Sequence, residues 1–314
     1  MRILIVKPSS LGDIIHAMVV VSALKLQYPD YIIDWVVGDR FFDIVHQSKI
    51  ASRVIIYERH GRLLSIFRLI SEIRQETYDY VFDMQGLARS GLMTFFAKSS
   101  HKIGRKDSRE CARLAYSKTV TYPGLVHAVD ILKEFLSIIG GSTEISGLVK
   151  ELENIHSPLL EKFLEIEIIP NRLVCVFSES QRPEKEWSFF MPMIQNFLEQ
   201  TEQTAVVLLG NKAFINNDIK SPLFFDLREK TSLGDIAFLI KYAQLVIAND
   251  SGPLHISAAL GRPTFGLFTT TDPSRFGPYP PNRNTNMALR LNNVESEVDM
   301  VVQTAIEMLE NGIC

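Results

Sequence analysis

The sequence predicts an α/β protein built from two doubly wound halves, each a parallel sheet covered by helices. The strand-like segments are apolar runs without polar alternation, which indicates strands covered on both faces. These runs alternate with stretches whose apolar residues recur at helical spacing, and the same order restarts in the second half. At 314 residues the chain is long enough for two domains of about 150 residues each.

The N-terminal half begins with an apolar strand over 3–6, followed by a helix over 14–28 that stops at Pro29. Residues 63–75 repeat apolar side chains at the spacing of an amphipathic helix. Further strands are expected over 32–37, 54–57 and 80–82, and further helices over 87–96 and 127–139.

The C-terminal half repeats this alternation. Mixed charge and weak periodicity over 140–171 place the boundary near residue 165, which gives domains 1–165 and 166–314. We expect the halves to face a central cleft, because ligands of such sheets bind beyond the carboxyl ends of the strands. Strands are expected over 173–177, 204–209, 224–227, 245–248 and 264–268, with helices near 189–199 and 233–242.

Composition narrows the class of protein. The chain is 46% hydrophobic and 22% charged, as in globular proteins, and its formal charge of -3 gives no general attraction to nucleic acid. Cys111, Cys175 and Cys314 lie far apart without a CxxC pair, so they indicate neither disulfides nor zinc, and a reducing cytoplasm fits best. The apolar run 14–24 contains His16 and is too short for a membrane span, so we interpret it as a core helix and leave peripheral membrane contact open.

The most informative motif is 249–255, Asn-Asp-Ser-Gly-Pro-Leu-His, which follows an apolar run and opens a short helix. Ser251 is a favourable N-cap residue, and Pro253 fits a first helical turn. The free amides and the dipole at such a helix start attract anions. The motif therefore predicts a seat for a diphosphate.

A second motif, 7–13, follows the first strand and lacks both the GxGxxG and the P-loop pattern. Asp13 can be interpreted as a helix-capping aspartate or as a general base that takes a proton from a hydroxyl. A helix start lowers the pKa of a carboxylate and weakens it as a base, whereas burial opposes that effect. Both interpretations stay open.

Three further side chains have competing roles. Lys185 follows a strand and can neutralise a phosphate, although most lysines are solvated. Trp187 is expected to pack under a helix rather than to stack on a base. For His255, a hydrogen bond to phosphate or to the loop backbone is favoured over catalysis.

Basic residues gather over 98–118, and Arg59, His60 and Arg62 lie in another loop of the same half. A charge run usually forms a solvated face. In a slightly acidic protein, two such clusters in one half favour an anionic acceptor.

Taken together, these motifs resemble the bacterial lipopolysaccharide heptosyltransferases, the ADP-heptose-dependent members of glycosyltransferase family 9. The resemblance covers nearly the whole chain and rests on the order of several short motifs. They are 1–13, 82–87 with Ser90, 108–110, Lys185 with Trp187, 230–233, 249–255 and 271–273.

The resemblance implies a GT-B fold of two Rossmann-like domains, with the acceptor on the first and the sugar nucleotide on the second. It implies inverting transfer of heptose from ADP-heptose to the Kdo sugar of Kdo-lipid A. We expect no cofactor and no metal, because the chain has no DxD-type carboxylate pair. A cytoplasmic location is expected, and association with the cytoplasmic face of the inner membrane stays open. Asp13 would be the base and Lys185 would hold the diphosphate, while 108–110 and His127 favour the first heptosyltransferase over the second. Expected donor contacts are Ser9, Ser10, Gly12, Ser178, Asp250, Ser251, Gly252, Pro253, Leu254 and His255, and expected acceptor contacts are Arg59, Arg62, Arg105, Arg109 and His127.

Two departures fall on the donor half. Family members usually have Phe-Gly-Pro-Thr-Asp-Pro where this chain has Phe-Thr-Thr-Thr-Asp-Pro over 268–273, and Glu229 replaces the glycine of a Gly-Lys-Thr-Ser pattern. These changes bear on the donor's identity more than on the fold. The alternatives are a related enzyme using another nucleotide sugar, an epimerase, or a non-catalytic binder of lipopolysaccharide precursors.

Overall fold

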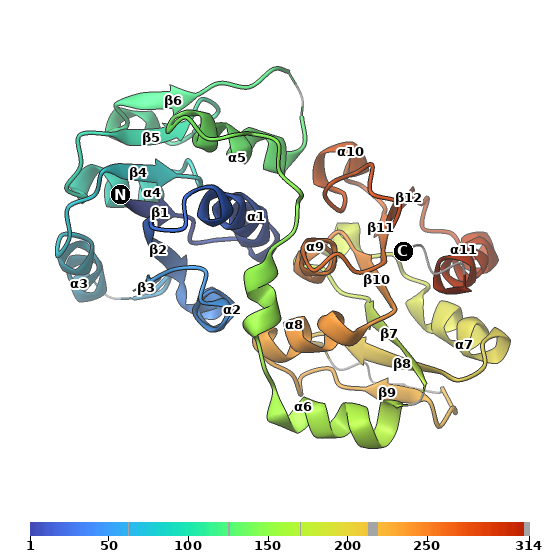
Figure 1. Cartoon of the computed structure of the whole chain (residues 1–314). Coiled ribbons are helices and arrows are strands. Elements are labelled where there is room, and N and C mark those ends of the chain that lie inside the picture. The colour runs from blue at the N-terminus through green and yellow to red at the C-terminus, as the bar shows by residue number, and fades with distance from the viewer. Residues whose placement is uncertain (62, 125, 170, 213–218, 311–314) are drawn as a thin grey trace. The chain divides into compact units, whose positions relative to one another are not determined.

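The computed structural model describes residues 1–61, 63–124, 126–169, 171–212 and 219–310. They form two compact units that divide after Asn154 (Figure 1). This division precedes the boundary expected near residue 165. The residues after it join the second unit because α6 (Pro158–Phe163) packs on α8 (Leu233–Tyr242), and Ser157 Oγ donates a hydrogen bond to Asp235 Oδ1 at 2.7 Å.

The first unit contains a six-stranded parallel sheet in the order β3-β2-β1-β4-β5-β6. Its strands are β1 (Arg2–Val6), β2 (Ile32–Gly38), β3 (Arg53–Tyr57), β4 (Tyr80–Asp83), β5 (Lys102–Arg105) and β6 (Lys118–Val120). Its helices are α1 (Leu11–Gln27), α2 (Phe42–Ser48), α3 (Leu63–Ile73), α4 (Ala88–Phe96) and α5 (Ala128–Ser137), with short turns η1 (Asp39–Phe41), η2 (Ala112–Ala115) and η3 (Lys150–Asn154).

The second unit repeats this topology, in the order β12-β11-β10-β7-β8-β9. Its strands are β7 (Arg172–Phe177), β8 (Thr204–Leu209), β9 (Phe224–Asp226), β10 (Leu245–Asn249), β11 (Thr264–Phe268) and β12 (Asn286–Arg290). Its helices are α6 (Pro158–Phe163), α7 (Phe190–Gln200), α8 (Leu233–Tyr242), α9 (Gly252–Ala259), α10 (Pro273–Phe276) and α11 (Val298–Glu310), with a short π-helix η4 (Leu164–Ile168) and the 3-10 helices η5 (Pro183–Lys185) and η6 (Glu295–Glu297).

The predicted strands include all the buried central ones and the two edge strands β3 and β9, while β5, β6 and β12 were not predicted. The central strands β1, β8 and β10 have almost fully buried side chains, as expected for a sheet covered on both faces. The strands β5, β6 and β12 are short or polar and lie at or next to a sheet edge. Their sequences therefore carry little periodic signal.

Both sheets have a point where the strand order reverses, between β1 and β4 in the first unit and between β7 and β10 in the second. Loops diverge at such a point and leave room for a ligand at the carboxyl ends of the strands. Residues 7–13 follow β1, and residues 250–255 follow β10. Each predicted motif therefore lies at the reversal point of its own sheet.

Within the described ranges, no helix combines the length and apolar character needed to cross a bilayer.

Candidate functional site

The loop after β1 is anchored by β2. Lys7 N donates to Val36 O at 3.2 Å, and the buried Trp35 Nε1 donates to Lys7 O at 3.3 Å. Gly38 approaches the loop so closely that a Cβ there would lie 2.7 Å from Pro8 O. These contacts hold the Lys7 side chain inside the unit.

Asp13 both caps α1 and faces Lys7. Its Oδ2 accepts hydrogen bonds from Ser10 N at 3.2 Å and from Ser10 Oγ at 2.7 Å, while its Oδ1 lies 3.6 Å from Lys7 Nζ. The Lys7 side chain is 2% exposed and the Asp13 side chain 42%. The capping interpretation of Asp13 is confirmed, and because the carboxylate is half-buried and still accessible, the general-base interpretation stays open.

The charges around Asp13 keep it ionised. Burial raises the pKa of Asp13, but Lys7, His16 and the hydrogen bonds from Ser10 outweigh this effect and hold the pKa well below its usual range. Burial also lowers the pKa of Lys7, which Asp13 opposes. The carboxylate is thus ready to accept a proton but is weakly basic.

This lowered pKa predicts a pH-dependent contribution to stability. The Asp13 carboxylate stabilises the folded chain above the unfolded pKa of about 4, and that stabilisation declines as the pH falls toward the folded pKa. We expect the difference in free energy of unfolding between wild type and Asp13→Asn to shrink between about pH 6 and about pH 3. Urea denaturation at both pH values measures it, and an unchanged difference would contradict the lowered pKa.

The turn after β4 is organised by Asp83, which the sequence reasoning missed. Its Oδ1 accepts hydrogen bonds from Gln85 N and Gly86 N, both at 2.9 Å, and its Oδ2 accepts one from Tyr116 OH at 2.8 Å. Burial raises the pKa of Asp83 despite these donors. Gln85 Oε1 in turn accepts from Ser9 N at 3.2 Å, so the loops after β1 and β4 are joined.

Residues 108–110 dock on this same turn. Arg109 N donates to Gly86 O at 2.9 Å, and Glu110 Oε2 accepts from Ala88 N at 3.1 Å. Gly86 has a φ of +76°, and a Cβ there would lie 3.3 Å from Ser108. The motifs 82–87 and 108–110, both part of the resemblance, therefore contact each other in the fold.

The arginines expected to bind an acceptor differ in exposure and in pairing: Arg105 is partly buried and paired, whereas Arg59 and Arg109 are exposed. Arg105 Nε and Nη2 contact the two oxygens of Asp107 at 2.9 and 2.7 Å. Burial lowers the pKa of Arg105, but pairing with Asp107 and the nearby Asp13 raise it overall. The Arg59 and Arg109 side chains are exposed, and Arg62 lies outside the described residues.

The His127 side chain, an expected acceptor contact, is buried. Its ring makes an edge contact with His16, with ring centroids 5.4 Å apart, and its Nδ1 accepts from Val129 N at 3.1 Å at the start of α5. His16 lies one helical turn after Asp13. The acceptor contact expected of His127 stays a prediction.

In the second unit, Asn249 joins the loops after β7 and β10. Its Oδ1 accepts from Trp187 N at 3.0 Å, and its Nδ2 donates to Ser178 O at 2.7 Å. Trp187 is buried in edge contact with Phe189 and Phe190, so the packing role predicted for it is confirmed.

Asn249→Ala should leave two buried backbone groups without partners. We expect the free energy of unfolding to fall by roughly 2–4 kcal/mol, because each orphaned group retains its desolvation cost. Chemical denaturation measures the change. A loss below about 0.5 kcal/mol would show that water replaces the amide.

Lys185 and Asp250 form a largely buried ion pair at the end of β10. Lys185 Nζ lies 2.5 Å from Asp250 Oδ2, which also accepts from Thr271 Oγ1 at 2.7 Å. Ser180 Oγ donates to the backbone oxygen of Asp250 at 3.3 Å. Ser180 and Thr271 were missed as site residues because only the fold brings them to Asp250.

The start of α9 has the form of an anion seat. Ser251 is the N-cap and Pro253 lies in the first turn, as predicted. Among the described residues, the buried hydroxyls of Ser178 and Ser251 have no hydrogen-bond partner. His255 is buried, with its Nε2 4.0 Å from Asp250 Oδ1. The arrangement offers amides, hydroxyls and one ammonium to a phosphate.

Of the other expected donor contacts, Ser9, Ser10 and Gly12 belong to the first unit, at the start of α1. The Ser9–Ser10 peptide is cis. Leu254 is fully buried within α9, so its side chain serves packing and only its backbone can face a ligand.

The atypical loop after β11 contacts the turn that carries Lys185. Thr269 Oγ1, at the position of the usual family glycine, donates to Glu184 O at 2.9 Å. We expect Thr269→Val to lower the free energy of unfolding by about 0.5–1.5 kcal/mol, the usual contribution of such a hydrogen bond. Chemical denaturation tests this, and Thr269→Ser should restore the wild-type stability.

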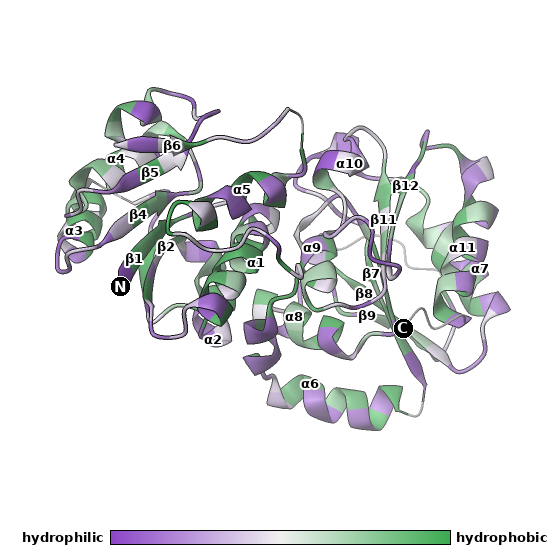
Figure 2. Cartoon of the chain, turned by 45° about the horizontal axis from the view of Figure 1, so that its top comes forward, coloured by the Kyte–Doolittle hydropathy of each residue, from purple (hydrophilic) through white to green (hydrophobic). Residues whose placement is uncertain are grey.

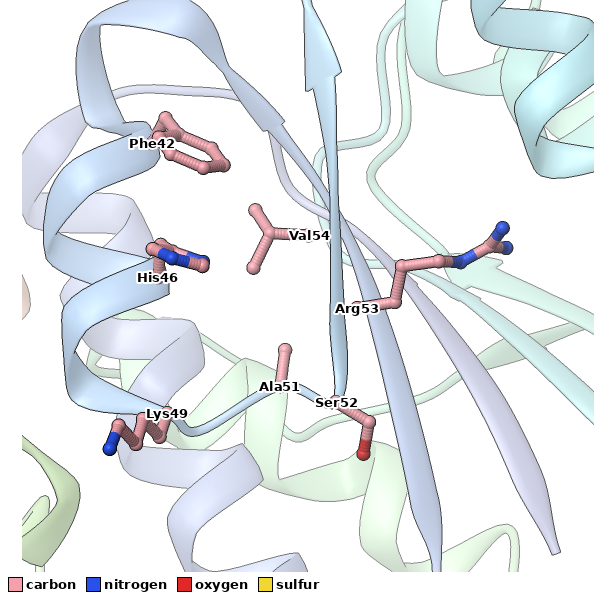
Figure 3. Close-up of a pocket in the computed structure, with 7 residues that line it drawn as sticks. All are labelled: Phe42, His46, Lys49, Ala51, Ser52, Arg53 and Val54. Atoms are coloured by element: carbon pink, nitrogen blue, oxygen red, sulfur yellow. The ribbon is translucent and has the colours of Figure 1, made fainter.

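A separate open cavity of about 430 Å³ lies between α2 and the start of β3, lined by Phe42, His46, Lys49, Ala51, Ser52, Arg53 and Val54 (Figure 3). The Arg53 guanidinium points away from this cavity and donates to Asp34, Gln75 and Tyr78. Because the cavity lies at the amino end of β3, it is distinct from the site after β1.

Comparison with known proteins agrees with this architecture. The family model described as "Glycosyltransferase family 9 (heptosyltransferase)" matches residues 66–301. The lipopolysaccharide heptosyltransferase 1 of Escherichia coli K12 is 26% identical and covers 99% of this chain and 100% of its own length. The lipooligosaccharide heptosyltransferase 2 of Haemophilus influenzae is also 26% identical, covering 87% of this chain and 84% of its own length.

Solved structures give the same fold. The E. coli heptosyltransferase WaaC with ADP aligns with a TM-score of 0.82 at 23% identity, covering 98% of this chain and 100% of its own. The two Rossmann-like units are therefore those of a GT-B fold. With the family model matched over most of its length, the chain belongs to glycosyltransferase family 9, the heptosyltransferases, and is a glycosyltransferase.

Proposed function

We propose that this protein is a lipopolysaccharide heptosyltransferase that moves a heptose from ADP-heptose to the Kdo of the inner core, with inversion at the anomeric carbon. Relatives named heptosyltransferase 1 and heptosyltransferase 2 match at equal identity. The choice of Kdo rests on the resemblance of 108–110 and His127 to the first enzyme.

The observation that carries the proposal is the site at the start of α9. A largely buried lysine and two buried hydroxyls without partners gather beside the amides of a helix start. In the described state Lys185 is neutralised by Asp250. We propose that the donor diphosphate takes over this ammonium, while Asp250 accepts hydrogen bonds from sugar hydroxyls.

In the proposed reaction, the acceptor hydroxyl attacks the anomeric carbon as its proton passes to Asp13. The bond to the nucleotide diphosphate breaks on the opposite face, and ADP departs with the electron pair. Lys185 and the Gly252 amide stabilise the growing negative charge on the leaving group. These protein groups supply the positive charge that a metal provides in other transferases, so we expect no metal and no cofactor.

On the acceptor side, the first unit offers cations for carboxylates and phosphates. Arg59 and Arg109 are exposed, and Arg105 lies near Asp13 with its guanidinium already bound to Asp107. Guanidinium groups bind such anions with paired hydrogen bonds. We propose that the exposed guanidinium groups of Arg59 and Arg109 bind the carboxylates and phosphates of the incoming acceptor.

The decisive experiment incubates the protein with ADP-heptose and Kdo-lipid A and weighs the product by mass spectrometry. A gain of one heptose supports the proposal. If a heptose is added only to an acceptor that already carries one heptose, the protein would instead be assigned the activity of a heptosyltransferase 2. Acceptor binding without turnover would indicate a non-catalytic binder.

Donor choice is tested separately by thermal shift with ADP-, UDP- and GDP-sugars. A ligand that binds the folded state alone raises the melting temperature. We expect the largest rise with ADP-heptose, and a larger rise with a UDP- or GDP-sugar would overturn the donor assignment.

A further inference from the structure

One outer surface of the first unit exposes large apolar side chains next to cations. Phe67 on α3 is 68% exposed, and Leu114 on η2 is 86% exposed. Figure 2 shows both hydrophobic and hydrophilic residues along the ribbons of α3 and α4. We define the α3–α4 surface by its five exposed apolar residues, Leu64, Phe67, Leu92, Phe95 and Leu114.

The elements of this surface pack on one another. Leu69 of α3 and Met93 of α4 belong to the same buried cluster, so both helices cover one face of the sheet. A Cβ on Gly91 of α4 would lie 2.9 Å from the Cα of Ala112, which places η2 directly against α4. The exposed residues therefore lie on neighbouring elements that cover one face of the sheet.

Cations flank the apolar residues. Lys102 Nζ lies 5.6 Å from the centre of the Phe95 ring, and Lys98 and Arg113 are exposed beside α4 and on η2. Of the acidic groups nearby, Glu72 is paired with Arg68 at 3.3 Å, whereas the Glu110 carboxylate accepts a hydrogen bond from Ala88 N and keeps its charge. Three cations, Lys98, Lys102 and Arg113, therefore face one unpaired acidic group. The surface is thus locally basic on a chain whose formal charge is -3.

We propose that the α3–α4 surface docks the protein on an anionic lipid surface. Phenylalanine and leucine side chains enter the boundary between headgroups and acyl chains, and lysine and arginine meet the headgroup phosphates. A second copy is a poorer occupant, because a two-fold contact would bring the same cations together. Such docking does not require the proposed reaction.

The test measures binding of the full chain to vesicles by flotation, without donor or acceptor. Wild type should bind phosphatidylglycerol-containing vesicles at least about tenfold better than phosphatidylcholine vesicles, with binding that weakens as salt is raised. Phe67→Ser combined with Phe95→Ser should reduce binding at least roughly tenfold. Lys98→Gln with Arg113→Gln should remove the preference for anionic vesicles.

The matched control is Leu159→Ser with Ile166→Ser, which changes two exposed apolar residues of the second unit. This control should bind like wild type, and thermal melts should show all variants folded. Equal binding to both vesicle types, or an equal loss in the control, would overturn the proposal. So would a wild-type dimer that the Phe67 and Phe95 changes convert to monomer, since a second copy would then occupy the surface.

Discussion

Asp13→Asn is expected to lower kcat by about 100- to 10,000-fold, the usual loss when a general base is removed. The substitution keeps the shape of the side chain and one oxygen that can accept from Ser10, so the cap on α1 largely survives. Binding of ADP-heptose, measured by thermal shift, should be retained. Loss of donor binding together with turnover would point to a structural role.

The chain contains a matched control for this experiment. Asp235 caps α8 just as Asp13 caps α1: its Oδ2 accepts from Ser232 N at 2.9 Å and from Ser232 Oγ at 2.8 Å. Asp235→Asn should cost about 1 kcal/mol or less of stability and leave kcat near wild type. If the two variants lose activity equally, capping rather than proton transfer explains Asp13.

Lys185→Ala is expected to lower kcat by about 100- to 1,000-fold, because the leaving diphosphate would lose its nearest fixed positive charge. The KM for the donor should rise as well, since the ammonium also contacts the bound substrate in the proposed reaction. Steady-state kinetics with ADP-heptose separate the two effects. A rise in KM with unchanged kcat would restrict Lys185 to ground-state binding.

Lys212→Ala provides the comparison. Lys212 also forms an ion pair in the second unit, with Nζ 2.9 Å from Glu186 Oε1, but its side chain is 54% exposed. Exposed pairs contribute little, so this variant should keep both kcat and stability near wild type. A similar loss of activity in both variants would mean that general positive charge, rather than the position of Lys185, is what the reaction needs.

The local organisation of the chain was predictable because it depends on neighbouring residues. The run 245–248 is apolar without alternation, and Ser251 with Pro253 marks a helix start. The position of Asp13 at the start of α1 followed from the same kind of signal. The departure at Thr269 was also visible in the sequence, although the hydrogen bond to Glu184 O was not.

The pairings within each site depended on the tertiary structure. Lys185 and Asp250 meet because β7 and β10 are neighbours in the sheet, and Asp83 approaches Tyr116 only through the order of β4, β5 and β6. The sequence by itself determined which segments are strands and helix starts, since backbone preference and periodicity act over a few residues. Only the fold decided which side chains neutralise one another, because ion pairing and desolvation depend on distances that sheet order sets.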